Sequence, residues 1–100
     1  MLIVTGHIHV EPSDRDEFTA DIQALARSSG QRDGNLFYAV AVDDRGAGRL
    51  LVVERWRDQA SLTAHLHEPD TREFVMRWQG RMRADIRKYD ASNERPLMEG

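Results

Sequence analysis

The chain has 100 residues, of which 40% are hydrophobic and 31% charged, a composition typical of one folded domain rather than a disordered segment. Its formal net charge of -3 argues against a nucleic-acid-binding protein, because such proteins usually carry a basic surface. The lack of cysteine excludes disulfides and thiolate chemistry, and no stretch approaches the roughly 20 apolar residues that a membrane span needs.

The first half of the chain predicts a strand, a helix and a second strand. Residues 2–10 are rich in β-branched side chains and alternate loosely, which favours a strand. A helix can begin at Pro12 or Ser13, and its apolar face is formed by Phe18, Ile22, Leu25 and Ala26. The segment 28–30 (Ser-Ser-Gly) ends that helix, Asp33-Gly34 is a turn, and residues 36–42 form the second strand.

The second half repeats this order after a hairpin loop at residues 43–48. Residues 50–56 form the third strand, and Asp58 is a suitable N-cap for a helix over residues 59–67. Pro69 interrupts this helix, which resumes over residues 71–79. Residues 82–89 form the fourth strand. The order is β-α-β-β-α-β, which predicts an α+β, ferredoxin-like domain over residues 2–90 with a C-terminal tail at 91–100.

The second and third strands carry apolar side chains on both of their faces. An antiparallel sheet with one wet face should alternate cleanly between apolar and polar residues. Two helical segments are enough to cover only one face of the predicted sheet, so the other face needs a different cover. We expect a second copy of the sheet to provide it, and the pattern therefore predicts a homodimer.

Several short motifs resemble one family. Gly34-Asn35-Leu36-x-Tyr38 opens the second strand and Glu54-x-Trp56 closes the third. The second helical region carries Ala60, Leu62, Ala64-His65-Leu66 and Phe74. Together with the order of elements, these residues resemble the antibiotic biosynthesis monooxygenase family, and within it the small quinol monooxygenase-like proteins. The resemblance extends over about residues 2 to 90.

This resemblance implies a dimeric α+β barrel with one pocket per subunit between the helices and the sheet. The better-known members oxidise electron-rich phenols or quinols with molecular oxygen and without metal or flavin, because a deprotonated quinol can itself pass an electron to oxygen. Quinone-forming members carry an Asn four positions before the Trp and a Tyr early in the second helix. The matching positions here are Val52 and Leu62, so only Trp56 of that polar set is present.

Five residues are the candidates for the site. His65 is the expected catalytic base, since its ordinary pKa of about 6.5 suits the removal of a phenolic proton. Trp56, Tyr38, Asn35 and Glu54 are the expected substrate-binding residues. Each also has a structural interpretation. Trp56 can be a core or interface anchor, and His65 can be a hydrogen-bonded structural residue. Glu54 can pair with Arg55, Arg83 or Arg87, and Tyr38 and Asn35 can simply form the start of the strand.

The predicted function is that of a cofactor-independent monooxygenase, with a small aromatic molecule and a second copy of the chain as its partners. We expect no bound metal, because the pair His7 and His9 has no carboxylate motif beside it. We expect no nucleotide cofactor, because Gly46-Ala47-Gly48 lies in a hairpin and not between a strand and a helix. Without a signal peptide, a cytoplasmic location is the default. Two alternatives remain: a non-catalytic dimeric barrel that binds an apolar ligand, and an isomerase or decarboxylase with a His base.

Overall fold

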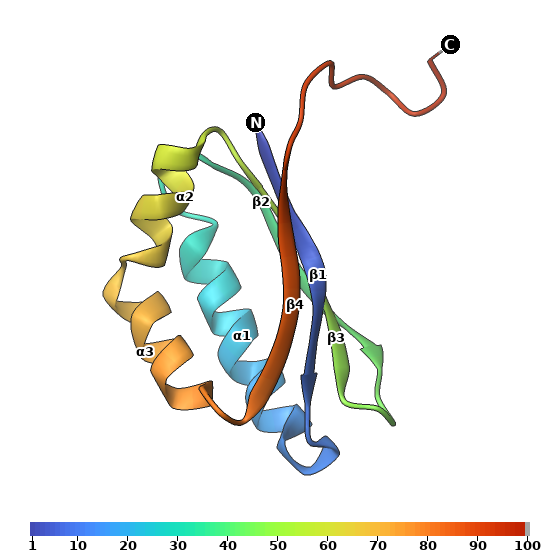
Figure 1. Ribbon diagram of the computed structural model, residues 1–100, viewed down its shortest axis with the longest axis vertical. Helices are drawn as coiled ribbons and strands as arrows, with labels where there is room; N and C mark the ends of the chain where they lie inside the picture. The colour runs from blue at the N-terminus through green and yellow to red at the C-terminus, as the bar shows by residue number, and fades with distance from the viewer. Residues whose placement is uncertain (100) are drawn as a thin grey trace.

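The computed structural model describes residues 1–99 and consists of one four-stranded antiparallel sheet with helices on one face (Figure 1). The elements follow in the order β1 (Leu2–Val10), a 3-10 turn η1 (Pro12–Asp14), α1 (Arg15–Ser29), β2 (Asn35–Asp44), β3 (Arg49–Trp56), α2 (Gln59–Leu66), α3 (Pro69–Trp78) and β4 (Met82–Asp90). The strand order in the sheet is β2-β3-β1-β4. This confirms the predicted βαββαβ ferredoxin-like arrangement.

β1 has the predicted bounds, whereas several other boundaries differ from the prediction by one to three residues for local reasons. The first turn after β1 is a 3-10 helix with Pro12 at its start, so that α1 begins only at Arg15. The second helical region consists of two separate helices, as Pro69 predicts, but α3 already begins at Pro69 itself. Proline is favoured at the first helical position, because no intrahelical hydrogen bond is lost there.

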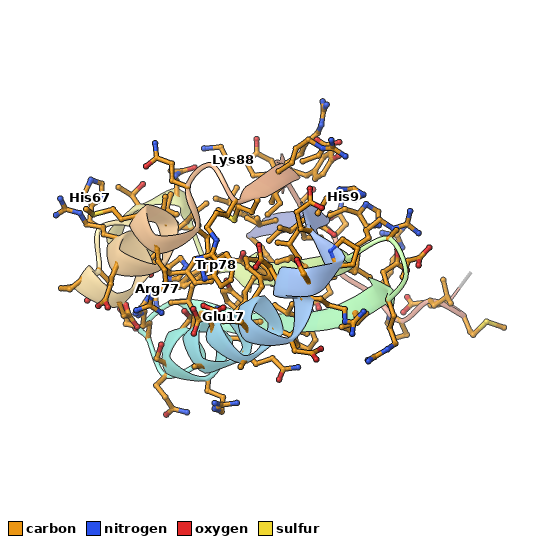
Figure 2. The ribbon with its side chains drawn as sticks, turned by 90° about the horizontal axis from the view of Figure 1, so that it is seen from below. His9, Glu17, His67, Arg77, Trp78 and Lys88 are labelled. Atoms are coloured by element: carbon orange, nitrogen blue, oxygen red, sulfur yellow. The ribbon has the colours of Figure 1, made fainter. Side chains whose placement is uncertain are left out.

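The helices bury one face of the sheet. Alternate residues of β1 and β3 point toward them, and the buried side chains form a core with the apolar faces of α1 and α3. Trp78 lies at the centre of this core with no exposed surface, and its ring meets that of Phe18 edge-on at 4.9 Å. Figure 2 shows Trp78 between the helices and the sheet. A second buried cluster surrounds Trp56 at the other end of the sheet.

The opposite face of the sheet carries no helix within residues 1–99 (Figure 1). The strand register places Ala39, Val53 and Thr5 side by side in its middle, with Ile3 and Arg55 in the next row. Phe37, Leu51 and Tyr89 are partly exposed around them. His7 also lies on this face, where its Nε2 is 3.5 Å from the carboxylate of Asp43. We call this surface the open face.

Two glycines allow neighbouring elements to approach closely. Gly34, with a φ of +82°, lies where α2 passes the start of β2, and a Cβ there would meet the Ser61 Oγ at 2.0 Å. Gly6 lies in the middle of β1, where a Cβ would be 2.0 Å from the carbonyl oxygen of Asp85 on β4. The first contact fixes the position of α2, and the second keeps β4 tight against β1.

Beyond β4 the chain continues as a tail without helix or strand to residue 99, and it extends away from the domain (Figure 1). Arg55 on the open face contacts Glu94 of this tail at 3.2 Å. Leu97 and Met98 are almost fully exposed. The last residue of the predicted tail, Gly100, lies outside the described residues. Among residues 1–99, no helix combines the length and the apolar character that a membrane crossing requires.

Candidate active site

A cavity of about 410 Å³ lies between the helices and the sheet, and every strand and all three α-helices contribute to its wall. Most of the lining is apolar, including Val52 on β3, Leu62 on α2 and Phe74 on α3. Arg87 and Lys88 of β4 contribute its positive charges. A space of this kind, apolar with few polar groups, is typical of a small-molecule site.

Three polar side chains of the cavity come from neighbouring elements and lie close together. Tyr38 lies on β2, Glu54 on β3 and His65 on α2, and all three line the cavity. Tyr38 pairs with Glu54 in the strand register, and the rings of Tyr38 and His65 are 5.9 Å apart. Three of the five residues predicted from the sequence are therefore together at one wall.

Trp56 lies behind this wall and not on its surface. It has no exposed area and does not line the cavity. Its ring stacks on the imidazole of His65 at 4.8 Å, and its indole N–H donates a hydrogen bond of 2.9 Å to Oε1 of Glu54. Trp56 therefore positions the two ionisable side chains, and this matches the structural interpretation of Trp56 as a core anchor.

Asn35 does not belong to the cavity wall. Its side-chain amide donates to the carbonyl of Phe37 within the same strand start. The expected ion pair of Glu54 with an arginine is also absent among residues 1–99: Arg55 contacts Glu94 of the tail and Arg87 contacts Asp85. Glu54 receives its hydrogen bond from Trp56 instead.

Burial shifts the acidity of the three polar groups. It raises the pKa of the Glu54 carboxyl, and the hydrogen bonds from Trp56 and Tyr38 offset this rise only in part. Burial, together with the nearby Glu54 carboxylate, also raises the pKa of the Tyr38 phenol. Burial and the neighbouring Arg32 guanidinium lower the pKa of His65 to about 4, so its imidazole is neutral at pH 7.

A polar network lies behind His65 that the sequence analysis did not identify. Arg32, in the turn after α1, contacts Nδ1 of His65 and the carboxylate of Asp70, and it donates to the Thr71 hydroxyl at 2.9 Å. Ser29, which has no exposed surface, places its hydroxyl 3.5 Å from the same His65 nitrogen. Arginine in a polar turn carries no sequence signal for such a role. The contacts exist because the turn, α2 and the start of α3 meet in space.

No group of three or more His, Cys, Asp or Glu side chains is arranged to hold a metal ion within residues 1–99. His7 lies on the open face beside Asp43, away from the cavity. His67, which follows α2, is exposed, and Figure 2 shows it at the outer end of the molecule.

Most of the chain matches the sequence profile of a known protein family. The sequence profile described as "Antibiotic biosynthesis monooxygenase" matches residues 1–77. The chain belongs to the antibiotic biosynthesis monooxygenase family. The resemblance expected from the motifs at Gly34–Tyr38, Glu54–Trp56 and Ala64–Leu66 is thereby confirmed.

Two curated proteins are similar to this chain over about three quarters of its length. A Bacillus subtilis (strain 168) protein named "Putative monooxygenase YcnE" is 27% identical over 75 residues, which cover 75% of this chain and 79% of that one. "Uncharacterized protein sll1783" of Synechocystis sp. is 32% identical over 74 residues, or 74% of this chain. The chain spans about half the length of the Synechocystis protein, since the match covers 50% of it.

Solved structures of other proteins share the fold of this family member. A crystal structure of "a putative antibiotic biosynthesis monooxygenase" from Deinococcus radiodurans superposes with a TM-score of 0.89 at 22% identity, covering 99% of this chain and all of that one. Rv0793 from Mycobacterium tuberculosis superposes with a TM-score of 0.83 at 18% identity, covering 93% of this chain and 96% of that one. At these identities the likeness establishes the fold.

Proposed function

We propose that the protein is a cofactor-independent monooxygenase that oxidises a quinol or polyphenol with molecular oxygen inside the cavity. The observation that carries this proposal is the grouping of Tyr38, Glu54 and His65 at one wall of an otherwise apolar cavity. Membership of the family supports the reaction class. The substrate and the mechanism are inferred from the chemistry of this wall.

The cavity suits the first step of such a reaction, the removal of a proton from a substrate hydroxyl. An aromatic ring is favoured among the apolar side chains, while its hydroxyl meets the polar wall formed by Tyr38, Glu54 and His65. Either Glu54 or His65 can interact with that hydroxyl, and a polar wall inside an apolar cavity can stabilise the anion that forms. The anion is electron-rich enough to reduce oxygen.

The overall reaction needs no further reductant. The quinolate passes one electron to oxygen, and the two radicals combine at a ring carbon. One oxygen atom then becomes a ring hydroxyl, and the other leaves as water with two hydrogen atoms from the quinol. The quinol becomes a hydroxyquinone and supplies all the electrons that reduce oxygen.

Oxygen uptake by the purified protein tests this proposal. With a panel of quinols we expect turnover by the wild-type protein and a loss of roughly 100-fold for His65→Ala. Met76→Ala is the matched control, because Met76 is 73% exposed on α3. The proposal fails if no quinol supports oxygen uptake, or if the rate is the same in His65→Ala.

A binding function is the second candidate, and Val52 and Leu62 favour it. Both are apolar, both line the cavity, and they occupy the positions where quinone-forming members carry Asn and Tyr. Native mass spectrometry of the purified protein would then detect an apolar ligand, and oxygen uptake would be absent. Turnover that persists without oxygen would instead indicate an isomerase or decarboxylase.

We also propose that the protein acts as a homodimer joined through the open face. Ile3, Ala39 and Val53 form an apolar centre there, and Phe37 and Tyr89 are 42% and 53% exposed beside it. An apolar surface of this kind is unfavourable in water unless a partner covers it. Light scattering should give twice the chain mass of 11.5 kDa, and Val53→Asp should give a monomer. A wild-type protein that stays monomeric would contradict this assembly.

A further inference from the structure

His65 contacts the cavity on one side and an arginine on the other. The Arg32 side chain is 16% exposed and reaches Nδ1 of His65 from the turn between α1 and β2. The same guanidinium donates to Thr71 Oγ1 at 2.9 Å and to Ser29 Oγ at 3.4 Å. These contacts hold it in one orientation behind the imidazole.

Asp70 fixes this orientation from the start of α3. Its carboxylate contacts Arg32 and accepts hydrogen bonds from the Ser28 hydroxyl at 2.7 Å and from the Thr71 backbone N–H at 2.8 Å. Burial acts to raise the pKa of Asp70, but the hydrogen bonds from Ser28 and Arg32 hold it below its ordinary value. Asp70 is therefore charged at pH 7 and keeps Arg32 in place.

The contact between Arg32 and His65 determines which imidazole nitrogen carries the proton. A guanidinium has N–H donors and no acceptor, so Nδ1 of His65 can only accept. In a neutral imidazole the proton is then on Nε2. No side-chain nitrogen or oxygen buried within residues 1–99 lacks a hydrogen-bond partner, and no protein partner of Nε2 occurs there. The Nε2–H group is thus accessible and free to donate to a bound molecule.

Glu54 complements this donor. Its carboxylate lines the same cavity, and Trp56 connects the two side chains by stacking on His65 and by donating to Glu54. The charged and titratable groups around His65 are Arg32 from the turn, Asp70 from α3, and Tyr38 and Glu54 from the sheet. Of these, Glu54 is the group that both lines the cavity and has a carboxylate oxygen that can accept a proton.

We propose that Arg32 is a positioning residue that holds His65 in the Nε2–H form, so that His65 donates a hydrogen bond to the substrate oxygen while Glu54 accepts the substrate proton. In this step the hydroxyl O–H bond of the substrate breaks, the proton binds a Glu54 oxygen, and the electron pair stays on the substrate oxygen. His65 forms no covalent bond and keeps its proton. This assignment differs from the expected role of His65 as the base. The part that concerns the substrate rests on the proposed function, whereas the proton position in the free protein does not.

Nitrogen-15 NMR of the ligand-free protein tests the role of Arg32 without any substrate. In the wild type, Nδ1 of His65 should give the signal of an unprotonated nitrogen and Nε2 that of a protonated one, with titration near pH 4. Arg32→Ala should give a mixture of both forms and a higher titration midpoint. Arg57→Ala is the matched control, because Arg57 pairs with Asp33 on the surface nearby and should leave both properties unchanged.

The wild-type spectrum can by itself contradict the positioning role, so the proposal can be tested even if Arg32→Ala fails to fold. A proton on Nδ1 in the wild type, or an unchanged spectrum in a folded Arg32→Ala, would overturn the positioning role. Oxygen uptake then tests the assignment of the base. Glu54→Gln should lose roughly 100-fold in kcat at pH 7. Wild-type turnover by Glu54→Gln would refute Glu54 as the base while leaving the Arg32 result intact.

Discussion

The contribution of His65 to the stability of the protein should fall between pH 7 and pH 5. The pKa of His65 falls from 6.5 to about 4 on folding, so in this interval the unfolded chain binds more protons than the folded one. Stability from this residue is fully present above pH 6.5 and is lost as the pH falls toward 4. Linkage gives a loss of about 2 kcal/mol between pH 7 and pH 5, and about 3 kcal/mol over the whole range.

Urea unfolding followed by circular dichroism at both pH values, at one protein concentration, measures this loss. His65→Gln should reduce the pH-dependent loss by about 2 kcal/mol, because glutamine does not titrate. Burial raises the pKa of Glu54, so Glu54 adds stability as the pH falls, opposite to His65. Because Glu54 is present in both the wild type and His65→Gln, its contribution cancels in the comparison. His67→Gln is the control: His67 is exposed, and this variant should lose as much unfolding free energy between pH 7 and pH 5 as the wild type. Equal losses in the wild type and His65→Gln would refute the buried, neutral imidazole.

Three further changes test other parts of the structure. Gly6→Ala should lower the free energy of unfolding by roughly 3 kcal/mol in the same urea assay, because the new Cβ meets backbone atoms of β4. Gly46→Ala is the control and should be nearly neutral, because the nearest atom to its Cβ lies at 3.6 Å. Glu54→Gln should keep or raise stability at pH 8 by up to about 1 kcal/mol, since it removes a buried charge and keeps an oxygen for the Trp56 indole. Trp56→Phe should cost about 2 kcal/mol by the same measurement, because the Glu54 carboxylate then loses its buried donor.

The spacing of apolar residues, together with capping residues and prolines, was sufficient to predict the order of strands and helices. A β-branched run marked β1 and apolar runs marked β2 and β3. Asp58 capped α2 through the Ser61 N–H at 2.8 Å as predicted, and Pro69 separated α2 from α3. These signals are local, so they do not depend on which segments meet in space. The ends of β2 and β4 were longer than predicted because pairing with neighbouring strands extends a strand beyond its apolar residues.

The site was predictable only where a residue's strand or helix face decides its direction. Tyr38 and Glu54 point to the helices by the alternation of β2 and β3, and His65 follows Leu62 by three positions on α2. Asn35 was misplaced because the strand start turns its amide back to the backbone. Arg32 acts through contacts with segments 33 and 38 residues away, and no local pattern encodes such a contact.

The stacking of Trp56 on His65 gives the protein an optical probe of its own site. The chain has two tryptophans, and both indoles are fully buried. A protonated imidazole in contact with an indole quenches its fluorescence, whereas a neutral one does so far less. A Trp78→Phe variant would emit from Trp56 alone, beside His65 and hydrogen-bonded to Glu54. The emission of that single indole would then report the protonation of His65 and the binding of a quinol in the cavity, without any label.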